Sequence, residues 1–217
     1  MKPDERARKL EELYRRIQGD PHYRNSSMGE AFVPGRGSLE ENLIVFIGEA
    51  PGREEERERQ PFVGPAGKNL ASLIGEVGIS QEHLHITNLL KYRPVTAKGE
   101  NRSPTPAESR YCLPYLLEEL EILAPGLVVC LGLSSAKALL NDTGLKMTDA
   151  NGTLFEKYGL RMLVTYHPSP FNYRVPSKRE ALHKAFGRIA ELSSRRGREA
   201  RDDRRDISTI QASPRGR

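Results

Sequence analysis

Cysteine is scarce in this sequence, and long apolar runs are absent. The 217 residues include two cysteines, Cys112 and Cys130. Two thiols cannot build an iron–sulfur site with four thiolate ligands, and a disulfide framework is not expected in a reducing cytosol. No apolar run approaches the ~20 residues that cross a bilayer. The charged segment 1–12 also lacks the apolar core of a signal peptide. We therefore expect a cytoplasmic protein that does not associate with a membrane.

The positive charge of the chain is concentrated at its C-terminal end. The formal net charge is +5, from 34 basic and 29 acidic residues. Segment 193–217 alone holds eight arginines and four acids, and it contains few apolar residues that could offset the cost of ordering. We predict a folded domain over residues 1–192 and a disordered Arg-rich tail over residues 193–217. This charge balance allows a nucleic-acid partner but does not demand one.

Apolar residues follow strand and helix periods alternately along the chain. Strands that alternate with helices are typical of a parallel sheet with helices on both faces. Thr105 adds a local signal, because it precedes Pro106 and stands three residues before Glu108 in the pattern of a helix capping box. We predict an α/β fold, a three-layer α/β/α sandwich around a central four-stranded parallel sheet. The expected strands are 42–47, 84–88, 127–131 and 161–166, and the expected helices are 4–18, 66–77, 106–123, 134–140 and 177–192.

Two loops place titratable side chains directly after the first and fourth expected strands. They are residues 48–52, with sequence GEAPG, and residues 167–170, with sequence HPSP. Glycine and proline beside the titratable group allow sharp, rigid turns. Ligands of an open parallel sheet bind beyond the carboxyl ends of its strands. Glu49 and His167 are therefore candidate active-site residues. An exposed loop glutamate and a structural histidine are the plainer alternatives.

Other side chains near these loops suit the recognition of a nucleic acid. Phe62 stands between proline and glycine, where it could stack on a planar ligand or plug the core. Asn88 ends the second expected strand, and its amide can read a base edge or bond its own backbone. Lys91, Arg93 and Arg102 can bind phosphates, and Phe171 and Tyr173 can wedge into a duplex. The plainer alternatives are solvated charges for the three cations and simple packing for the two rings.

Taken together, these segments resemble the uracil-DNA glycosylase superfamily, most closely its family 4, whose members usually carry an iron–sulfur cluster. Order and spacing both agree from about residue 43 to residue 189. The matching segments are GEAPG at 48–52, PFVG at 61–64 with Ala66-Gly67, ITN at 86–88, Lys91, Arg93-Pro94, Asn101-Arg102, Pro104, Pro106, Leu131-Gly132 and His167-Pro168.

The resemblance implies that a base is flipped out of the duplex into a pocket. His167 would stabilise negative charge growing on the base O2, and Glu49 would position water or support the sugar cation. Phe62 would stack on the base, while Asn88 would bond the uracil edge and reject cytosine. The other implied contacts are those of Gly48 and Ala50 with the substrate, and those of Lys91, Arg93, Arg102, Ser169, Phe171 and Arg174 with DNA.

The chain departs from the family pattern at two places. Family 4 uses four cysteines to hold its cluster. In this chain Cys112 alone matches one of them, and Tyr92 stands at the position of another. We therefore predict no iron–sulfur cluster and no other metal, with aromatic packing around Tyr23 and Tyr92 in the place of the cluster. Arg59 stands where the family usually has a glycine, and a positive φ there would distort the loop that carries Phe62.

The leading hypothesis is a monomeric DNA glycosylase that excises uracil from DNA and so initiates base excision repair. A version that prefers another deaminated base, such as hypoxanthine, keeps the same chemistry. The alternative is a catalytically degenerate glycosylase-like module that binds DNA or a protein partner. The Arg-rich tail could attract phosphates, or it could be a solubilising terminus or partner tether. A nucleotide-binding protein is disfavoured, because the chain has neither a Walker lysine motif nor a GxGxxG segment after a strand.

Overall fold

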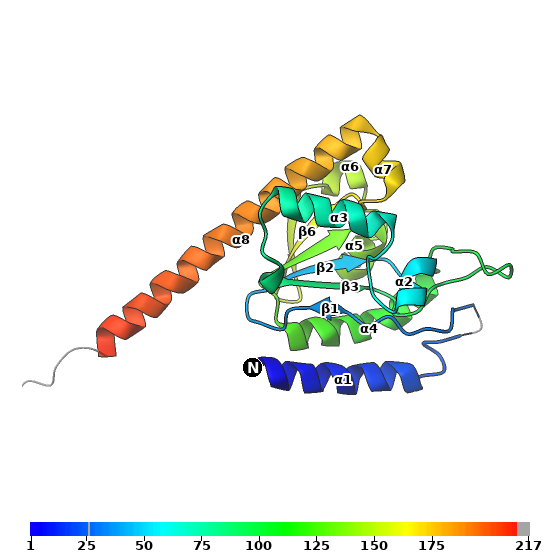
Figure 1. Cartoon of the computed structure of the whole chain (residues 1–217), viewed down its shortest axis with the longest axis horizontal. Helices are drawn as coiled ribbons and strands as arrows, with labels where there is room; N and C mark the ends of the chain where they lie inside the picture. Colours follow the sequence, from blue (N-terminus) through cyan, green and yellow to red (C-terminus); the bar gives the residue numbers. More distant parts are fainter. Residues whose placement is uncertain (26, 212–217) are drawn as a thin grey trace, which may run out of the picture.

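A computed structural model describes residues 1–25 and 27–211, with side chains described as far as residue 194. Its centre is a six-stranded sheet with strand order β1-β3-β2-β4-β6-β5 (Figure 1). Strands β3, β2, β4 and β6 are mutually parallel, as the sequence predicts. The parallel strands are β2 (Ile44–Gly48), β3 (Leu84–Asn88), β4 (Leu127–Leu131) and β6 (Leu160–Thr165).

The prediction of four strands omits two short antiparallel edge strands. β1 (Arg36–Gly37) pairs with β3, and β5 (Leu154–Lys157) pairs with β6. β1 has two exposed residues and therefore no apolar pattern to detect. β5 returns into β6 through Tyr158 and Gly159, which both have positive φ, at 54° and 71°. Two consecutive positive φ values are the conformation of a tight hairpin turn.

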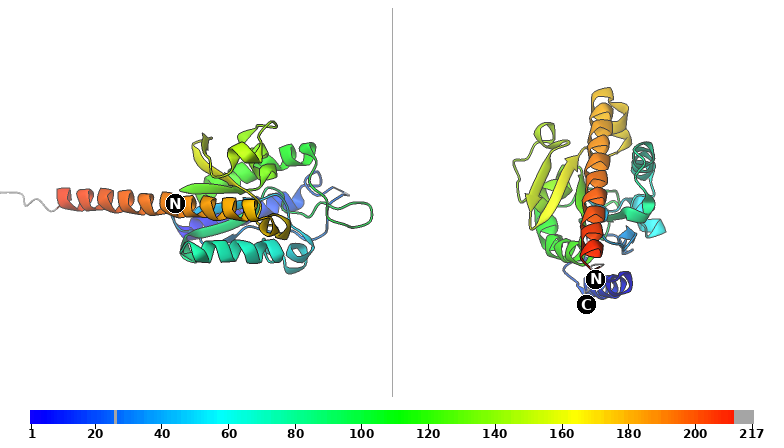
Figure 2. Two further views of the ribbon diagram at one scale, coloured as in Figure 1. Left: turned by 90° about the horizontal axis from the view of Figure 1, so that it is seen from above. Right: turned by 90° about the vertical axis from the view of Figure 1, so that its left-hand side faces the viewer.

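Alternate residues of the central strands enter two separate cores. In β2, Val45 and Ile47 pack in a core with helices α1, α4 and α5, whereas Ile44 and Phe46 pack in a core with α3 and α8. Because helices cover both faces of a parallel sheet, its strands are continuous apolar runs in the sequence. Figure 2 shows the sheet between its helical layers. The helices are α1 (Pro3–Gly19), α4 (Pro106–Leu123), α5 (Leu133–Leu140), α3 (Pro65–Glu76) and α8 (Pro176–Gln211).

Local capping groups set the starts of several helices. The capping box of α4 is confirmed, because the Thr105 hydroxyl accepts the Glu108 N–H at 3.2 Å and the Glu108 carboxylate accepts the Thr105 N–H at 2.7 Å. Ser169 accepts the Asn172 N–H at 3.3 Å and begins a short helix after the histidine loop. The short elements that the sequence did not predict are α2 (Arg53–Glu58), η1 (Gln81–His83), α6 (Met147–Ala150) and α7 (Pro170–Arg174).

Helix α8 continues past residue 192, where the sequence predicts the folded domain to end. It packs on the sheet through Leu182, Phe186 and Ile189, and its backbone stays helical to Gln211. Figure 1 shows it leaving the body on the side of the amino ends of the parallel strands. Residues 193–211 therefore differ from the predicted disorder, and residues 212–217 lie outside the described part. The domain boundary at residue 192 stays a prediction.

No helix in the described part of the chain combines the length and the apolar character needed to cross a membrane.

Candidate active site

The carboxyl ends of β2 and β3 bring a ring and an amide to one backbone position. The strand register pairs Gly48 with Asn88. A Cβ built on Gly48 would lie 2.3 Å from the Asn88 Oδ1 atom and 2.8 Å from the Phe62 ring. No real side chain tolerates such contacts, so only glycine lets these two groups approach the end of β2. The structure thus places three of the residues predicted to contact the substrate around a single point.

His167, at the end of β6, completes this edge of the site. Its ring centroid lies 5.9 Å from that of Phe62, with the two planes inclined by 34°. Two amides anchor the backbone of its loop: Asn172 donates to the His167 carbonyl at 3.0 Å, and Asn69 donates to the Pro168 carbonyl at 2.9 Å. Burial lowers the pKa of His167, while the carboxylates of Glu49 and Glu55 oppose that shift. The imidazole is therefore neutral at pH 7.

Glu49 lies partly exposed between β2 and the start of α5. Its backbone carbonyl accepts the Leu90 N–H at 3.1 Å, which joins the glutamate loop to the segment after β3. The Ser134 hydroxyl donates to the carboxylate of Glu49. Sequence reasoning missed Ser134, although its place just after Leu131-Gly132 at the end of β4 was a usable signal. Glu49, Phe62, Asn88 and His167 thus gather at the carboxyl edge of the sheet from four separate segments.

The loop that carries Phe62 contains two residues in the left-handed region. Arg59 has φ 53° and Phe62 has φ 55°. Such a conformation costs a non-glycine residue about 1–2 kcal/mol. Arg59 thus has the positive φ that a glycine adopts without cost, and Phe62 shares this strained conformation. The Phe62 side chain is nevertheless 8% exposed and packs against Gly48.

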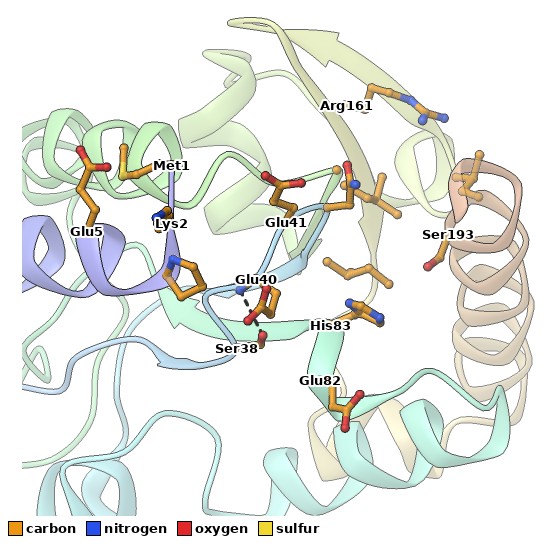
Figure 3. A pocket seen from close by; sticks show the side chains of 16 residues that line it. Met1, Lys2, Glu5, Ser38, Glu40, Glu41, Glu82, His83, Arg161 and Ser193 are labelled. Atoms are coloured by element: carbon orange, nitrogen blue, oxygen red, sulfur yellow. Dashed lines mark hydrogen bonds between the residues drawn. The ribbon is translucent and has the colours of Figure 1, made fainter. Parts of the chain in front are cut away.

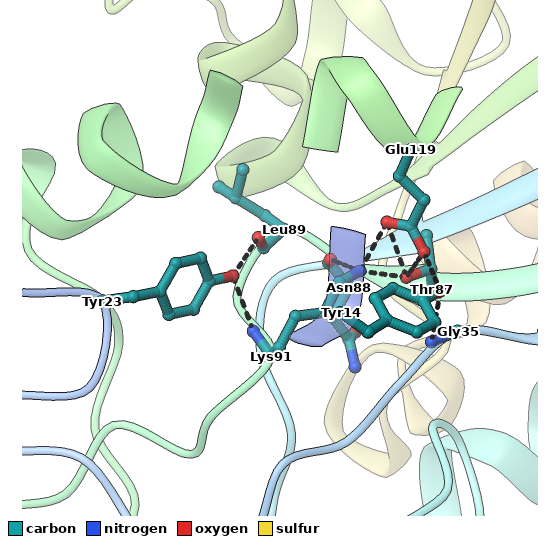
Figure 4. Close-up of polar contacts among 8 residues, drawn as sticks. All are labelled: Tyr14, Tyr23, Gly35, Thr87, Asn88, Leu89, Lys91 and Glu119. Carbon is teal, nitrogen blue, oxygen red and sulfur yellow. Dashed lines mark hydrogen bonds and ion pairs between the residues drawn. The ribbon is translucent and has the colours of Figure 1, made fainter. Parts of the chain in front are cut away.

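The predicted DNA contact is wrong for Lys91. This side chain is 1% exposed, and its Nζ atom lies 2.6 Å from a Glu119 carboxylate oxygen. The same ammonium donates to the backbone carbonyl of Asn88 at 2.9 Å, as Figure 4 shows. An ammonium enclosed in this way cannot reach a phosphate outside the protein. Lys91 instead supports the strand end that carries the Asn88 amide.

Arg93 and Arg102 are engaged with carboxylates of the protein itself. Arg93 Nε lies 2.6 Å from Glu56, and Arg102 contacts both oxygens of Glu108 at 2.8 and 2.7 Å. The latter pairing lowers the pKa of Glu108 to about 2. A phosphate would have to compete with these partners, so a DNA contact by either arginine stays a prediction.

The tip of α7 exposes an aromatic ring on the same edge of the molecule. Phe171 is 72% exposed, which is unusual for a large apolar side chain. Arg174 is exposed beside it, and Ser169 is used as the cap of α7. Lys178, which sequence reasoning missed, places its ammonium 5.0 Å from the Phe171 centroid. The tip therefore combines an apolar ring with two cations next to the histidine loop.

Comparison with known proteins identifies the family. The model of the Uracil DNA glycosylase superfamily matches residues 34–188, which include every site residue described above. The chain belongs to this superfamily. A relative named Type-4 uracil-DNA glycosylase, from Archaeoglobus fulgidus, is 39% identical over 172 residues, which cover 76% of this chain and 83% of the relative.

Further relatives distinguish two types within the superfamily. A Type-4 uracil-DNA glycosylase from Saccharolobus solfataricus is 40% identical over 171 residues, covering 75% of this chain and 76% of the relative. A Type-5 uracil-DNA glycosylase from Pyrobaculum aerophilum is 31% identical over 156 residues, covering 64% and 66%. The higher identity to the type-4 relatives agrees with the motif resemblance.

An iron–sulfur cluster of this superfamily does not fit the residues around Cys112. The ring of Tyr23 packs edge-on against Tyr92 with centroids 6.1 Å apart, and the Tyr23 hydroxyl interacts with the Cys112 thiol. Burial raises the pKa of Cys112 to about 12, and it does the same for Cys130 inside β4. One thiol among tyrosine rings cannot supply the four thiolate ligands that a cluster needs.

A large hollow among the described residues lies away from the superfamily's motif residues. It has a volume of about 1180 Å³ and opens at the amino ends of the strands, between Met1, Glu41 and Ser193 (Figure 3). Ligands of open α/β sheets bind at the opposite edge. We therefore place the active site at the carboxyl ends, where the motif residues meet.

Buried His85 and half-buried His167 should make the protein less stable as the solution becomes acidic. Burial lowers the pKa of His85 and of His167 in the folded state. Below their unfolded pKa of about 6.5, the unfolded chain binds protons that the folded chain does not. The free energy of unfolding should then fall by up to about 1.4 kcal/mol per pH unit for each histidine. Urea denaturation at about pH 7.5 and about pH 5.5 measures this, and equal values would contradict it.

Proposed function

We propose that this chain is a monofunctional DNA glycosylase that hydrolyses the N-glycosidic bond of uracil in DNA and so initiates base excision repair. The observation that carries the proposal is the convergence of Glu49, Phe62, Asn88 and His167 on one edge of the sheet. The names of its relatives, with 39% and 40% identity, point to the same substrate. Fold alone would not justify the proposal, because one fold hosts many functions.

Recognition begins when the target base leaves the duplex and enters the pocket. Phe62 provides a face for stacking, and the lack of a side chain at Gly48 lets the Phe62 ring and the Asn88 amide come together at the end of β2, where they can both contact the base. The Asn88 amide can donate to the uracil O4 and accept from its N3–H. Cytosine presents the opposite polarity at these two positions and is rejected, because it would leave buried polar groups unpaired.

Bond cleavage sends the electron pair of the glycosidic bond onto the base. His167 is neutral at pH 7, so its N–H can donate to the oxyanion that develops at O2. Glu49 stabilises the positive charge that develops on the sugar and accepts a proton from the water that attacks C1′. Ser134 holds one carboxylate oxygen of Glu49, which leaves the other free for this water.

DNA binding involves the exposed tip of α7. Phe171 would enter the minor groove and fill the space left by the flipped nucleotide. Arg174 and Lys178 would bind phosphates on either side, since both cations lie near the exposed ring. Ser169 and Ala50 would contact the DNA and the base through their short side chains and backbone.

The protein is proposed to work as a cytoplasmic monomer without a cluster or any other metal. The packing of Tyr23 against Tyr92 and the interaction of Tyr23 with Cys112 support this, because aromatic side chains surround the one thiol that matches a cluster ligand of the family. Purified protein should contain no stoichiometric iron and show no visible absorption from a cluster. Iron analysis and a visible spectrum check the expectation, and a cluster found by both would overturn it.

An oligonucleotide with a single uracil tests the proposed function. The labelled strand is incubated with the protein and then with alkali, which cleaves abasic sites. Strand cleavage is expected for uracil in preference to hypoxanthine and thymine-mismatch substrates. Tight DNA binding with no cleavage of any substrate would instead favour the degenerate binding module.

A further inference from the structure

A single carboxylate links the glutamate loop to the phenylalanine loop. One oxygen of Glu55 accepts the Gly52 N–H at 3.1 Å, and the other accepts the Gly64 N–H at 2.9 Å. Gly52 ends the segment that carries Glu49, and Gly64 ends the segment that carries Phe62. Both oxygens of one side chain are therefore used to hold two parts of the active site together.

The two glycines are needed for this arrangement. A Cβ on Gly52 would lie 2.7 Å from Glu55 Oε2, and a Cβ on Gly64 would lie 3.1 Å from Glu55 Oε1. On the other side of the loop, a Cβ on Gly67 would lie 1.9 Å from the Phe62 carbonyl oxygen. The phenylalanine loop is thus enclosed between a carboxylate and the first turn of α3.

The enclosure accounts for the strained backbone of the loop. Phe62 has φ 55°, a conformation that persists only where the surroundings hold it. Hydrogen bonds to an ionised carboxylate are stronger than neutral ones, so Glu55 is suited to this task. The negative charge also reaches the catalytic histidine, because Glu55 acts to raise the pKa of His167.

A simple helix cap would not explain both contacts. Glu55 does close the N-terminus of α2 through Gly52, as in a capping box. The bond to Gly64, however, spans nine residues and leaves the helix altogether. A residue that served α2 alone would have no reason to make it.

We propose that Glu55 is a positioning residue of the active site, which fixes the stacking ring of Phe62 relative to the Glu49 carboxylate. This inference rests on the proposed glycosylase function for its effect on catalysis. Its structural part, the clamp between the two loops, can be tested without any activity.

The variant Glu55→Gln keeps the shape of the side chain and one acceptor oxygen. Its amide nitrogen is a donor, so it cannot accept the second backbone N–H. Glu54→Gln is the matched control, because Glu54 is an exposed glutamate of the same helix whose carboxylate also lies beside Gly64, while the structure gives it no hydrogen bond among the described residues. Both variants lose one negative charge, and Glu54→Gln leaves the clamp intact.

Catalysis and binding should respond differently in Glu55→Gln. We expect the single-turnover rate of uracil excision to fall about 100-fold, since small displacements of catalytic groups have effects of this size. The Kd for an undamaged duplex should stay within about twofold, because the α7 tip is unaffected. Glu54→Gln should keep both values within about twofold. A partly unfolded variant would lose binding and rate together.

Limited trypsin digestion measures directly how firmly Glu55 holds the two loops together. Arg59 is exposed in the loop between the two segments, and the bond after it should be cut several times faster in Glu55→Gln than in Glu54→Gln. If the wild-type protein excises no base, faster cutting still supports the clamp while the proposed function fails. Unchanged cutting after Arg59, or an excision rate equal to that of Glu54→Gln, overturns the proposal.

Discussion

Replacing Glu49 with glutamine should lower the single-turnover rate of uracil excision by about 10²- to 10⁴-fold. The glutamine amide can still accept the Ser134 hydroxyl, so the local geometry is retained. The variant loses the negative charge that stabilises the sugar cation and the group that accepts a proton from water. The rate is measured with the uracil oligonucleotide at enzyme excess, so that product release does not limit it.

Two further variants separate charge from geometry at this site. Ser134→Ala removes the hydroxyl that orients the Glu49 carboxylate but keeps its charge, so its loss of rate should be smaller. Asn88→Ala should lose activity heavily while leaving Glu49 unchanged, because the uracil edge then has no partner. Thermal unfolding of each variant controls for misfolding. A Glu49→Gln rate within a few-fold of the wild type would exclude the proposed role.

Replacing Lys91 with methionine should reduce the free energy of unfolding by about 3–5 kcal/mol. Lys91 and Glu119 are 1% and 0% exposed, and their charged atoms lie 2.6 Å apart. In the variant, Glu119 keeps hydrogen bonds from Tyr14 at 2.6 Å and Thr87 at 3.1 Å but has no opposite charge (Figure 4). A whole domain is stable by about 5–15 kcal/mol, so this change is large. Urea denaturation at pH 7 measures it.

The double variant Lys91→Met with Glu119→Leu provides the control. Replacing both charges by apolar groups removes the unpaired charge, so most of the lost stability should return. The Asn88 carbonyl still lacks its donor in this variant, because the Lys91 ammonium that bonds it at 2.9 Å is gone. We therefore expect recovered stability with a reduced excision rate. A single variant as stable as the wild type would show that the pair contributes little.

Much of the fold and the position of the site could be predicted from the sequence. The residue pattern identified β2, β3, β4 and β6, most clearly for β2 and β4, which are apolar throughout because both of their faces are buried. Glu49 and His167 follow two of these strands directly, so a parallel arrangement alone brings them to one edge. The capping box before α4 was equally readable, because it depends on residues three positions apart.

Contacts between distant segments could not be read in this way. Lys91 looked like a phosphate ligand because its partner, Glu119, stands 28 residues away on α4. Glu55 carries no motif of its own, and it matters only because folding places its carboxylate against the backbone of Gly52 and Gly64. The sequence by itself determined the parallel strands and the groups at their ends, since periodicity is local. Tertiary structure alone decided which charges are buried, paired or free, because burial depends on which distant segments pack against each side chain.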